Sequence, residues 1–582
     1  MAKTSIPARK LCRNPEGHPA FMRPDWPLLG KRLGQWLLGM LVTQYVWSAG
    51  EAVIATSHPL AAEAGAWALE RGGDAVDAAA AIQFALDVVE PQSSGIGGGA
   101  FFLVYRAATH QVYALDAREV APRADTPDQF SRLNYLEAST SGIAVGVPGT
   151  LAGVEALRQR WGRLTLAQSL QPAIDYARKG IVITPYLAHS LQSSRAALQP
   201  EARALTRDAQ GQVRSLGQRW VQPELAHSLS LIARMGPKVF YEGEIARAMV
   251  VAQRRTRAGP AGQGRMSLED LAHYQPVWRA PLEGEYRGYR IVTMPPPSSG
   301  GVAVLQALQT LAPFRLGALP GLGAGDPDEI HLTIEALRLA MADRARWLGD
   351  PAATPIPLEH LLSPPYLAQQ SRRLERRKRM EDVLPGTWPE GTNTTQFTVV
   401  DHEGNVVSVT STVEAPWGSG ILVPGYGFFL NSELTDFNLK PQAGPGDPGA
   451  NDVRPQRRPR SSMAPTLVFK GDQWVSAYGS PGGVSIISTV LETTQDLLDD
   501  ALTPEAALSL PRYAVMDAQG HTLVEKSLAP AVLDQLRARG HEVTVSEIPL
   551  GSVQWVGENP QTHERQGAAD PRRDGTVIRL LP

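Results

Sequence analysis

The chain has 582 residues, 43% of them hydrophobic, with 56 Lys and Arg against 58 Asp and Glu and a formal net charge of -2. This composition is that of a large globular protein with ample material for a buried core. Charges so evenly balanced offer no basic surface, so we expect no nucleic acid partner. The one cysteine, Cys12, excludes an internal disulfide and a cysteine-based metal cluster. Because no His-Glu-x-x-His or comparable spacing occurs, we expect no metal or other cofactor.

Residues 1–50 have the pattern of a leader. Lys31 and Arg32 precede a mostly apolar run at 33–47, and small residues follow at 48–50. This order of charge, apolar stretch and small residues is typical of a secretory signal, so we expect a periplasmic or secreted protein. Polar residues interrupt the run, which is too short for a comfortable membrane span. The alternative is a disordered leader on a cytoplasmic protein.

From residue 51 onward, helical and strand patterns alternate. Apolar and alanine residues at helical spacing predict helices at 58–73 and 75–89. The segment 93–106, SSGIGGGAFFLVYR, is a glycine loop that runs into a strand, and a second strand is predicted at 111–118. The pattern indicates a mixed chain of helices and strands. The glycine run does not fit a dinucleotide-binding motif, because a strand follows where a helix should begin.

The segment 371–393 is a poor core element. It opens with a run of Arg, Lys and Glu, which is typical of a solvated helix face, and it ends in a stretch rich in Gly and Pro. We interpret it as a loop or connector that leads to Thr394. After it, the pattern predicts two strands joined by a short turn, at 394–401 and 405–412. Further strands are predicted at 421–430, 465–470 and 473–479, and a helix at 486–500.

The predicted hairpin places two threonines side by side. If its turn centres on Glu403, antiparallel pairing puts Thr394 directly opposite Thr412. A threonine at the start of a strand, after a Gly and Pro loop, is where an N-terminal nucleophile would lie. Cleavage before it would free an α-amine that could act as its base. Threonine-rich strands are also ordinary β-sheet, so geometry alone leaves both interpretations open.

Several segments, in order along the chain, resemble the γ-glutamyltranspeptidase (glutathione hydrolase) family of N-terminal-nucleophile hydrolases. The likeness extends from about Ala52 to near the C-terminus. Any one segment would be a weak signal, but so many in the right order make a specific one. The segments are LDAREVAP (115–122), TTQFTVVDHEGNVVSVTST (394–412), LNSELTDF (430–437), RPRSSMAP (458–465) and GSPGG (479–483), with support from VEPQSSGIGGG, GVPGT, PPPSSGG and HLTIEALRLAMADRARWLGDP.

The resemblance implies an α+β fold, a four-layer αββα sandwich built as one unit from two fragments. The precursor is expected to cut itself between Asn393 and Thr394, giving a large subunit, 51–393, and a small subunit, 394–582, that stay together as a heterodimer. Thr394 would then attack the γ-amide carbonyl of glutathione or another γ-glutamyl compound. The acyl group would pass to water or to the amine of an amino acid or dipeptide.

The family match also assigns roles to other residues. Thr412 would support the nucleophile, and Gly482 and Gly483 would form the oxyanion hole, where glycine lets backbone N–H groups approach the developing charge. A γ-glutamyl group carries a carboxylate and an ammonium on one carbon, so its site needs both signs of charge. The carboxylate contacts would be Arg118, Ser461 and Ser462, and the ammonium contacts would be Glu414, Glu433 and Asp436. The alternative for Arg118 is a structural ion pair with Glu119 or another acid.

Two features depart from the family pattern. Gln396 stands where many relatives have histidine. The segment 438–460, where some members carry a lid, lacks the aromatic residue that such lids usually present. Two rival functions remain: an acylase of the same superfamily that removes a glutaryl-like group, and a non-catalytic relative kept as a binding protein. The acidic residues favour a γ-glutamyl substrate, because a glutaryl group has no ammonium.

Overall fold

The computed structural model describes residues 50–256, 258–317, 324–381, 383 and 393–582. The expected leader, apart from Gly50, lies outside the described residues. All described residues belong to one unit that spans Ser48–Pro582. Among them, no helix combines the length and the hydropathy that a membrane span requires.

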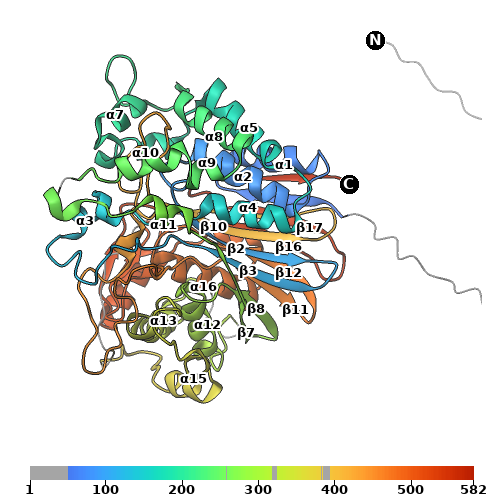
Figure 1. The fold of residues 1–582 in the computed structure, drawn as a ribbon. Helices are drawn as coiled ribbons and strands as arrows, with labels where there is room; N and C mark the ends of the chain where they lie inside the picture. The colour runs from blue at the N-terminus through green and yellow to red at the C-terminus, as the bar shows by residue number, and fades with distance from the viewer. Residues whose placement is uncertain (1–49, 257, 318–323, 382, 384–392) are drawn as a thin grey trace, which may run out of the picture. The chain divides into compact units, whose positions relative to one another are not determined.

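Two antiparallel sheets form the middle of this unit (Figure 1). Within the described residues, one sheet has seven strands in the order β18-β1-β9-β10-β2-β3-β6, and the other has six in the order β17-β16-β12-β11-β8-β7. The first consists of β1 (Ala52–Thr56), β2 (Gly99–Arg106), β3 (Gln111–Ala117), β6 (Val277–Arg279), β9 (Thr395–Val400), β10 (Val406–Thr412) and β18 (Thr576–Leu580). The second consists of β7 (Leu282–Tyr286), β8 (Tyr289–Thr293), β11 (Thr466–Lys470), β12 (Gln473–Tyr478), β16 (Gln554–Glu558) and β17 (Arg565–Ala569).

Strand β2 explains why the two sheets stack. Side chains alternate between the faces of a strand. Ala100, Phe102 and Val104 belong to a core shared with helices, whereas Phe101 and Leu103 belong to a core shared with the second sheet. Because β2 is apolar on both faces, the seven-stranded sheet must be covered on both sides.

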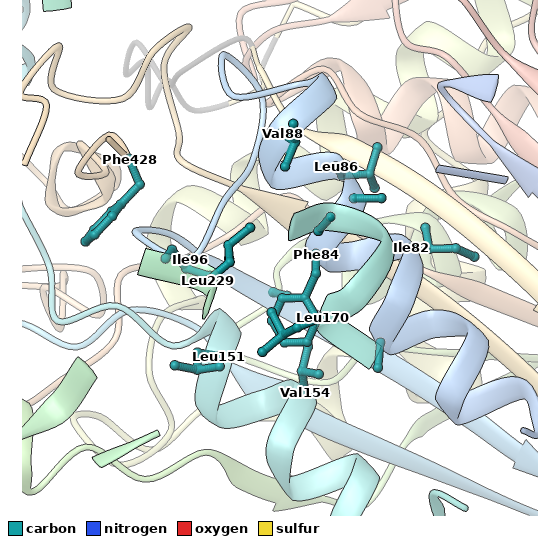
Figure 2. Packing of buried hydrophobic residues seen from close by; sticks show 14 of the residues in the cluster. Ile82, Phe84, Leu86, Val88, Ile96, Leu151, Val154, Leu170, Leu229 and Phe428 are labelled. Carbon is teal, nitrogen blue, oxygen red and sulfur yellow. The ribbon is translucent and has the colours of Figure 1, made fainter. Parts of the chain in front are cut away.

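Helix α2 (Ala75–Val89) lies at the centre of the first helical layer. An Asp74–Asp77 capping box starts the helix, and each of its residues is buried. In Figure 2, Phe84 packs near Leu170 and Val154 from neighbouring helices. The helices that contribute to this core are α1 (Pro59–Leu69), α2, α4 (Thr150–Trp161), α5 (Leu166–Lys179), α6 (Pro185–Ser190), α7 (Pro200–Thr206), α8 (Pro223–Met235), α9 (Lys238–Tyr241), α10 (Glu244–Ala252) and α11 (Leu268–Ala272).

A second helical layer covers the six-stranded sheet (Figure 1). Its main helices are α12 (Gly300–Leu311), α13 (Pro327–Trp347) and α16 (Ser485–Leu498), joined by α17 (Pro504–Ser509), α18 (Pro530–Ala538) and the small sheet of β13 (Tyr513–Val515), β14 (Thr522–Val524) and β15 (Val543–Val545). Helix α3 (Tyr135–Ser139), helices α14 (Leu358–Leu361) and α15 (Pro364–Ser371), and the pair β4 (Ile181–Val182) and β5 (Arg219–Trp220) lie in the connections. The predicted α+β sandwich of four layers is therefore confirmed.

One predicted strand is wrong. Residues 421–430 form only an isolated bridge between Leu422 and Phe429. Gly425 and Gly427 between them have positive φ angles of 78° and 70°, so the chain turns back on itself before a strand can extend. The charged run after α15 is not the solvated helix face that its composition suggested, because residues 372–381 form no regular helix. The Gly and Pro stretch at 384–392 lies outside the described residues.

Candidate active site

Thr394 and Thr412 lie at one end of two central strands. The β9–β10 ladder runs from Val400 opposite Val406 to Thr395 opposite Ser411, and Thr394 and Thr412 occupy the next positions beyond it. Their hydroxyl oxygens are 3.3 Å apart. The predicted register is the observed one, because the turn forms where the sequence places it.

The turn is fixed by Asp401. Its carboxylate accepts hydrogen bonds of 2.9 Å from the backbone N–H groups of Glu403 and Asn405. Gly404 supplies the positive φ of 84° that the turn needs. A turn held at this position sets the register of every pair along the hairpin, including the two threonines.

The carbonyl oxygen of Asn393 lies between the two threonine hydroxyls. It is 2.7 Å from the Thr394 Oγ1 and 2.9 Å from the Thr412 Oγ1, and both hydroxyls can donate to it. The backbone N–H of Glu414 donates to the Thr412 oxygen at 2.9 Å. This bond directs the Thr412 proton toward the Asn393 carbonyl. The nucleophile candidate is therefore adjacent to the peptide bond that precedes it.

The side chain of Asn393 is held by residues to which the sequence analysis gave no role. Its Oδ1 accepts hydrogen bonds from Ser93 (3.1 Å), Tyr186 (2.9 Å) and Arg573 (3.3 Å). Its Nδ2 donates to the carbonyl of Gln92 at 2.7 Å. Gln92 and Ser93 lie in the family-like segment VEPQSSGIGGG, which was the only available signal for them. No motif marks Tyr186 or Arg573.

Arg118 forms the charged centre of the site. Its guanidinium contacts the carboxylates of Glu433 and, at 2.6 Å, Asp436, and it donates to the backbone carbonyls of Pro459 and Arg460. Burial opposes the charge of Arg118, but the surrounding carboxylates outweigh burial and raise its pKa.

Glu433 and Glu119 share the surroundings of this guanidinium. Burial raises the pKa of Glu433, although Arg118 favours its charged form. Burial also raises the pKa of Glu119 to about 7, against the attraction of Arg118. A single guanidinium beside several buried acids thus favours retention of a proton within this group.

The predicted site residues line one cavity of about 20 Å³, with the exception of Gly482. This volume holds about one water molecule. The carboxylate of Glu414 lines the cavity but already accepts hydrogen bonds from Tyr135, at 2.7 Å, and from Ser432. The cavity is lined by Arg118, Asn393, Thr394, Thr412, Glu414, Glu433, Asp436, Ser461, Ser462, Met463, Gly483 and Ile486.

Gly482 and Gly483 precede the N-terminus of α16. Their φ angles, 133° and 59°, are positive, and a Cβ on Gly482 would lie 2.4 Å from the Ser485 hydroxyl. Only glycine fits this path without strain. Gly483 faces the small cavity, whereas Gly482 and Asn393 line a neighbouring cavity of about 740 Å³. The two glycines thus border the space on both sides of the Asn393–Thr394 bond.

The two departures from the family pattern have structural roles. Gln396 donates to the Ser408 hydroxyl at 3.0 Å and accepts from the Thr410 hydroxyl at 2.6 Å, so it ties β9 to β10. It also packs beside Gly479, where a Cβ would lie 2.5 Å from its Oε1. Among the described residues, none at 438–460 lines the small cavity; this segment contributes the two backbone carbonyls that hold Arg118.

The model of the family described as gamma-glutamyltranspeptidase matches residues 61–580. The chain belongs to the gamma-glutamyltranspeptidase family. It is 37% identical to the glutathione hydrolase proenzyme of Bacillus subtilis strain 168, over 91% of each chain.

Solved structures support the same assignment. The cephalosporin acylase of Bacillus halodurans aligns with a TM-score of 0.79 and 29% identity over 96% of this chain and 99% of the acylase. A chain of the Helicobacter pylori gamma-glutamyltranspeptidase aligns with a TM-score of 0.52 and 35% identity; the match covers 92% of that chain and 56% of this one. The family-like motifs therefore identified the correct family, and the protein is an enzyme of the N-terminal-nucleophile hydrolase fold.

Proposed function

We propose that this protein is a γ-glutamyltransferase and glutathione hydrolase that matures by cutting its own chain between Asn393 and Thr394. One observation carries the proposal: the Thr394 hydroxyl lies 2.7 Å from the Asn393 carbonyl oxygen, in the same cavity as Arg118, Glu433 and Asp436. A nucleophile, its first target and the charges that suit an α-amino acid thus meet in one place.

Self-cleavage begins with attack of the Thr394 Oγ1 on the Asn393 carbonyl carbon. The C–N bond breaks, the Thr394 nitrogen takes up a proton and an ester joins Asn393 to the Thr394 oxygen. This step frees the α-amine of Thr394. Water then hydrolyses the ester, which leaves a carboxylate on Asn393 and restores the Thr394 hydroxyl. The Thr412 hydroxyl, 2.9 Å from the same carbonyl oxygen, stabilises the negative charge that develops there.

The two fragments, 51–393 and 394–582, stay together after the cut. Strand β1 of the large fragment pairs with β9 and β18 of the small one, and β2 pairs with β10, so three strand pairs of the seven-stranded sheet join the two fragments. Separation would expose these buried strands. The match to the Helicobacter pylori chain, which corresponds to 56% of this chain, agrees with a separate large subunit.

Cleavage also opens the glutamyl site. A cavity of about 20 Å³ cannot hold a γ-glutamyl group while Asn393 fills one side of it. Once the bond is cut, Asn393 can leave. The free amine of Thr394 then takes the proton from its own hydroxyl, which attacks the γ-amide carbonyl of glutathione or another γ-glutamyl compound. The leaving amine takes the proton, and the acyl group passes to water or to the amine of an amino acid or dipeptide.

The charges favour a γ-glutamyl over a glutaryl substrate. In the uncleaved chain Arg118 is paired with Glu433 and Asp436. An α-amino acid group can insert between Arg118 and these two acids. Its carboxylate then pairs with Arg118, and its ammonium pairs with Glu433 and Asp436. A glutaryl group brings only the carboxylate and leaves the two acids without a cation. Breaking a buried pair in this way costs about 3–5 kcal/mol.

A denaturing gel of the purified protein, with N-terminal sequencing, tests the proposal. Two fragments are expected, and the smaller should begin Thr-Thr-Gln-Phe. Thr394→Ala should remain one chain and should have no activity on a γ-glutamyl anilide. Thr394→Ser should keep part of the self-cleavage and part of the activity. Cleavage of Thr394→Ala at the same bond would exclude Thr394 as the processing nucleophile. A mature wild type that binds γ-glutamyl compounds without turnover would favour the non-catalytic alternative.

We further propose that residues up to about Gly50 direct export. The charge, apolar run and small residues at 31–50 support this. Protein recovered from its native host should lack these residues and lie outside the cytoplasm. A mature large fragment that still contains Cys12 would refute export.

A further inference from the structure

A second acidic cavity, of about 210 Å³, lies between α13, α16, α18 and β13. It shares no lining residue with the Thr394 cavity. Helix α16 contributes to both cavities. Ile486 in its first turn lines the Thr394 cavity, and Glu492 and Asp496, farther along the helix, line the second cavity. We name it the carboxylate cavity after Glu329, Glu492 and Asp496.

Two carboxylate oxygens in this cavity lack partners. The side chains of Glu329, Glu492 and Asp496 line it and are buried, with 5%, 7% and 9% of each residue exposed. Among the described residues, no group hydrogen-bonds to the Glu329 Oε2 or the Glu492 Oε1. A buried carboxyl oxygen without a partner is destabilising, so natural proteins retain few of them without a bound molecule or another function.

The nearby cations are committed to other acids. Arg512 is the one cationic side chain among the residues that line the cavity, and it lies 2.5 Å from Asp570. It also donates to the carbonyl of Leu550 at 3.0 Å. Arg572, close enough to favour the charged form of Glu492, pairs with Glu525 at 2.6 Å. Arg512 also favours the charged forms of Glu492 and Asp496, but within the described residues none of the three acids forms a salt bridge of its own.

Apolar side chains also line the cavity. They include Ile330 of α13, Leu510, Leu528 and Val532 of α18. Within the described part of the chain, no three acidic, His or Cys side chains are placed to hold a metal ion. A cavity lined by both acidic and aliphatic side chains suits a molecule with a cationic head and a hydrocarbon chain.

We propose that the carboxylate cavity binds an aliphatic primary amine in its ammonium form. The ammonium would lie among Glu329, Glu492 and Asp496, with its three donors facing their oxygens, and the hydrocarbon chain would pack against the aliphatic side chains that line the cavity. The volume corresponds to about seven water molecules, so the ligand has about seven non-hydrogen atoms. The site is distinct from the γ-glutamyl site and goes beyond the proposed function.

Amine binding at this site should depend on pH. Burial raises the pKa of Glu329 to about 9 and of Asp496 to about 8, and it raises that of Glu492 well above its usual range. Glu329 and Asp496 therefore keep their protons at neutral pH in the free protein, and a bound ammonium displaces those protons. Affinity should rise from pH 6 to pH 9, and binding should release protons. The other charged groups that act on the three acids are Asp326, Asp499, Asp500, Arg512 and Arg572.

Calorimetry with the purified full-length protein tests the site, with n-hexylamine as the probe. The wild type should bind hexylamine at least about tenfold more tightly than 1-hexanol or hexanoate, which have similar shapes without the positive charge. Glu492→Gln and Glu329→Gln should each weaken hexylamine binding about tenfold or more. Equal affinity for the amine and the alcohol, or unchanged affinity in both variants, would overturn the proposal.

Two further variants distinguish binding in the carboxylate cavity from binding at other acidic side chains. Glu505→Gln, on the exposed side of α17, and Asp436→Asn, in the Thr394 cavity, should leave hexylamine affinity unchanged. Loss of binding in Asp436→Asn with none in Glu492→Gln would place the amine at the γ-glutamyl site and refute the inference. If Glu492→Gln fails to fold, Glu329→Gln and the comparison of amine with alcohol in the wild type still decide the question.

Discussion

Arg573 donates a hydrogen bond of 2.6 Å to the carbonyl oxygen of Thr394 and a second, of 3.3 Å, to the side chain of Asn393. Its guanidinium lies over the ring of Tyr186, 4.4 Å from the centroid. One planar side chain thus contacts both residues of the bond that we propose is cut. The forked donors of arginine suit this bridge, and a lysine ammonium would not.

Arg573→Lys should therefore slow self-cleavage. The variant keeps the charge but loses one of two hydrogen bonds, and a charge-assisted bond contributes about 1.5–3 kcal/mol, which corresponds to roughly 10- to 100-fold in rate. The measurement is the fraction of cut chain over time on a denaturing gel. Arg579→Lys is the matched control, because Arg579 lies on nearby β18 and pairs with Glu51 at the surface. Equal maturation of both variants would contradict the bridge.

Thr412→Val should lower turnover by about 10²–10⁴-fold, because valine keeps the shape and removes the hydroxyl that lies 3.3 Å from the Thr394 oxygen. Thr412→Ser, which retains a hydroxyl, is the control and should recover most of the rate. The assay is kcat on a γ-glutamyl anilide with fully matured protein. A mature valine variant as fast as the serine variant would remove Thr412 from the mechanism.

Asp436→Asn and Arg118→Ala should separate the two charges of the substrate. Asp436→Asn should reduce kcat/KM for a γ-glutamyl anilide by several powers of ten and leave that for the glutaryl anilide nearly unchanged, because only the first substrate carries an ammonium. Arg118→Ala should damage both, since both carry the carboxylate. Equal losses of kcat/KM for both substrates in Asp436→Asn would mean that Asp436 supports the structure and does not recognise the ammonium. A wild type that prefers glutaryl would establish the acylase alternative.

Stability should fall as the pH rises from about 5 to about 9. Burial raises the pKa of Glu329 to about 9, and that of Asp496 to about 8. In this window the folded chain keeps protons that the unfolded chain loses, so deprotonation favours unfolding. Each group costs at most about 1.4 kcal/mol per pH unit. Glu329→Gln and Asp496→Asn should flatten the decline of the urea midpoint between pH 5 and pH 9, whereas Glu547→Gln at the surface should not.

The β9–β10 hairpin could be predicted from the sequence because the residues that determine it are close together in the chain. Strand alternation, the turn at Asp401–Asn405 and the Gly and Pro connector all lie within a short stretch around Thr394. Local information also failed at 421–430, where an apolar run suggested a strand. There the glycines at 425 and 427 turn the chain, and the apolar pattern by itself did not show that they would.

The sequence alone determined the hydrophobic pattern, the turn and the motif residues, because periodicity and turn chemistry depend on neighbours in the chain. Only the tertiary structure decided which distant groups meet. Arg118 reaches Glu433 and Asp436 across more than three hundred residues, and Arg573 reaches Thr394 from near the C-terminus. Such contacts depend on how the sheets stack and on which apolar faces bury each other. That choice is a property of the whole core, so no single segment encodes it.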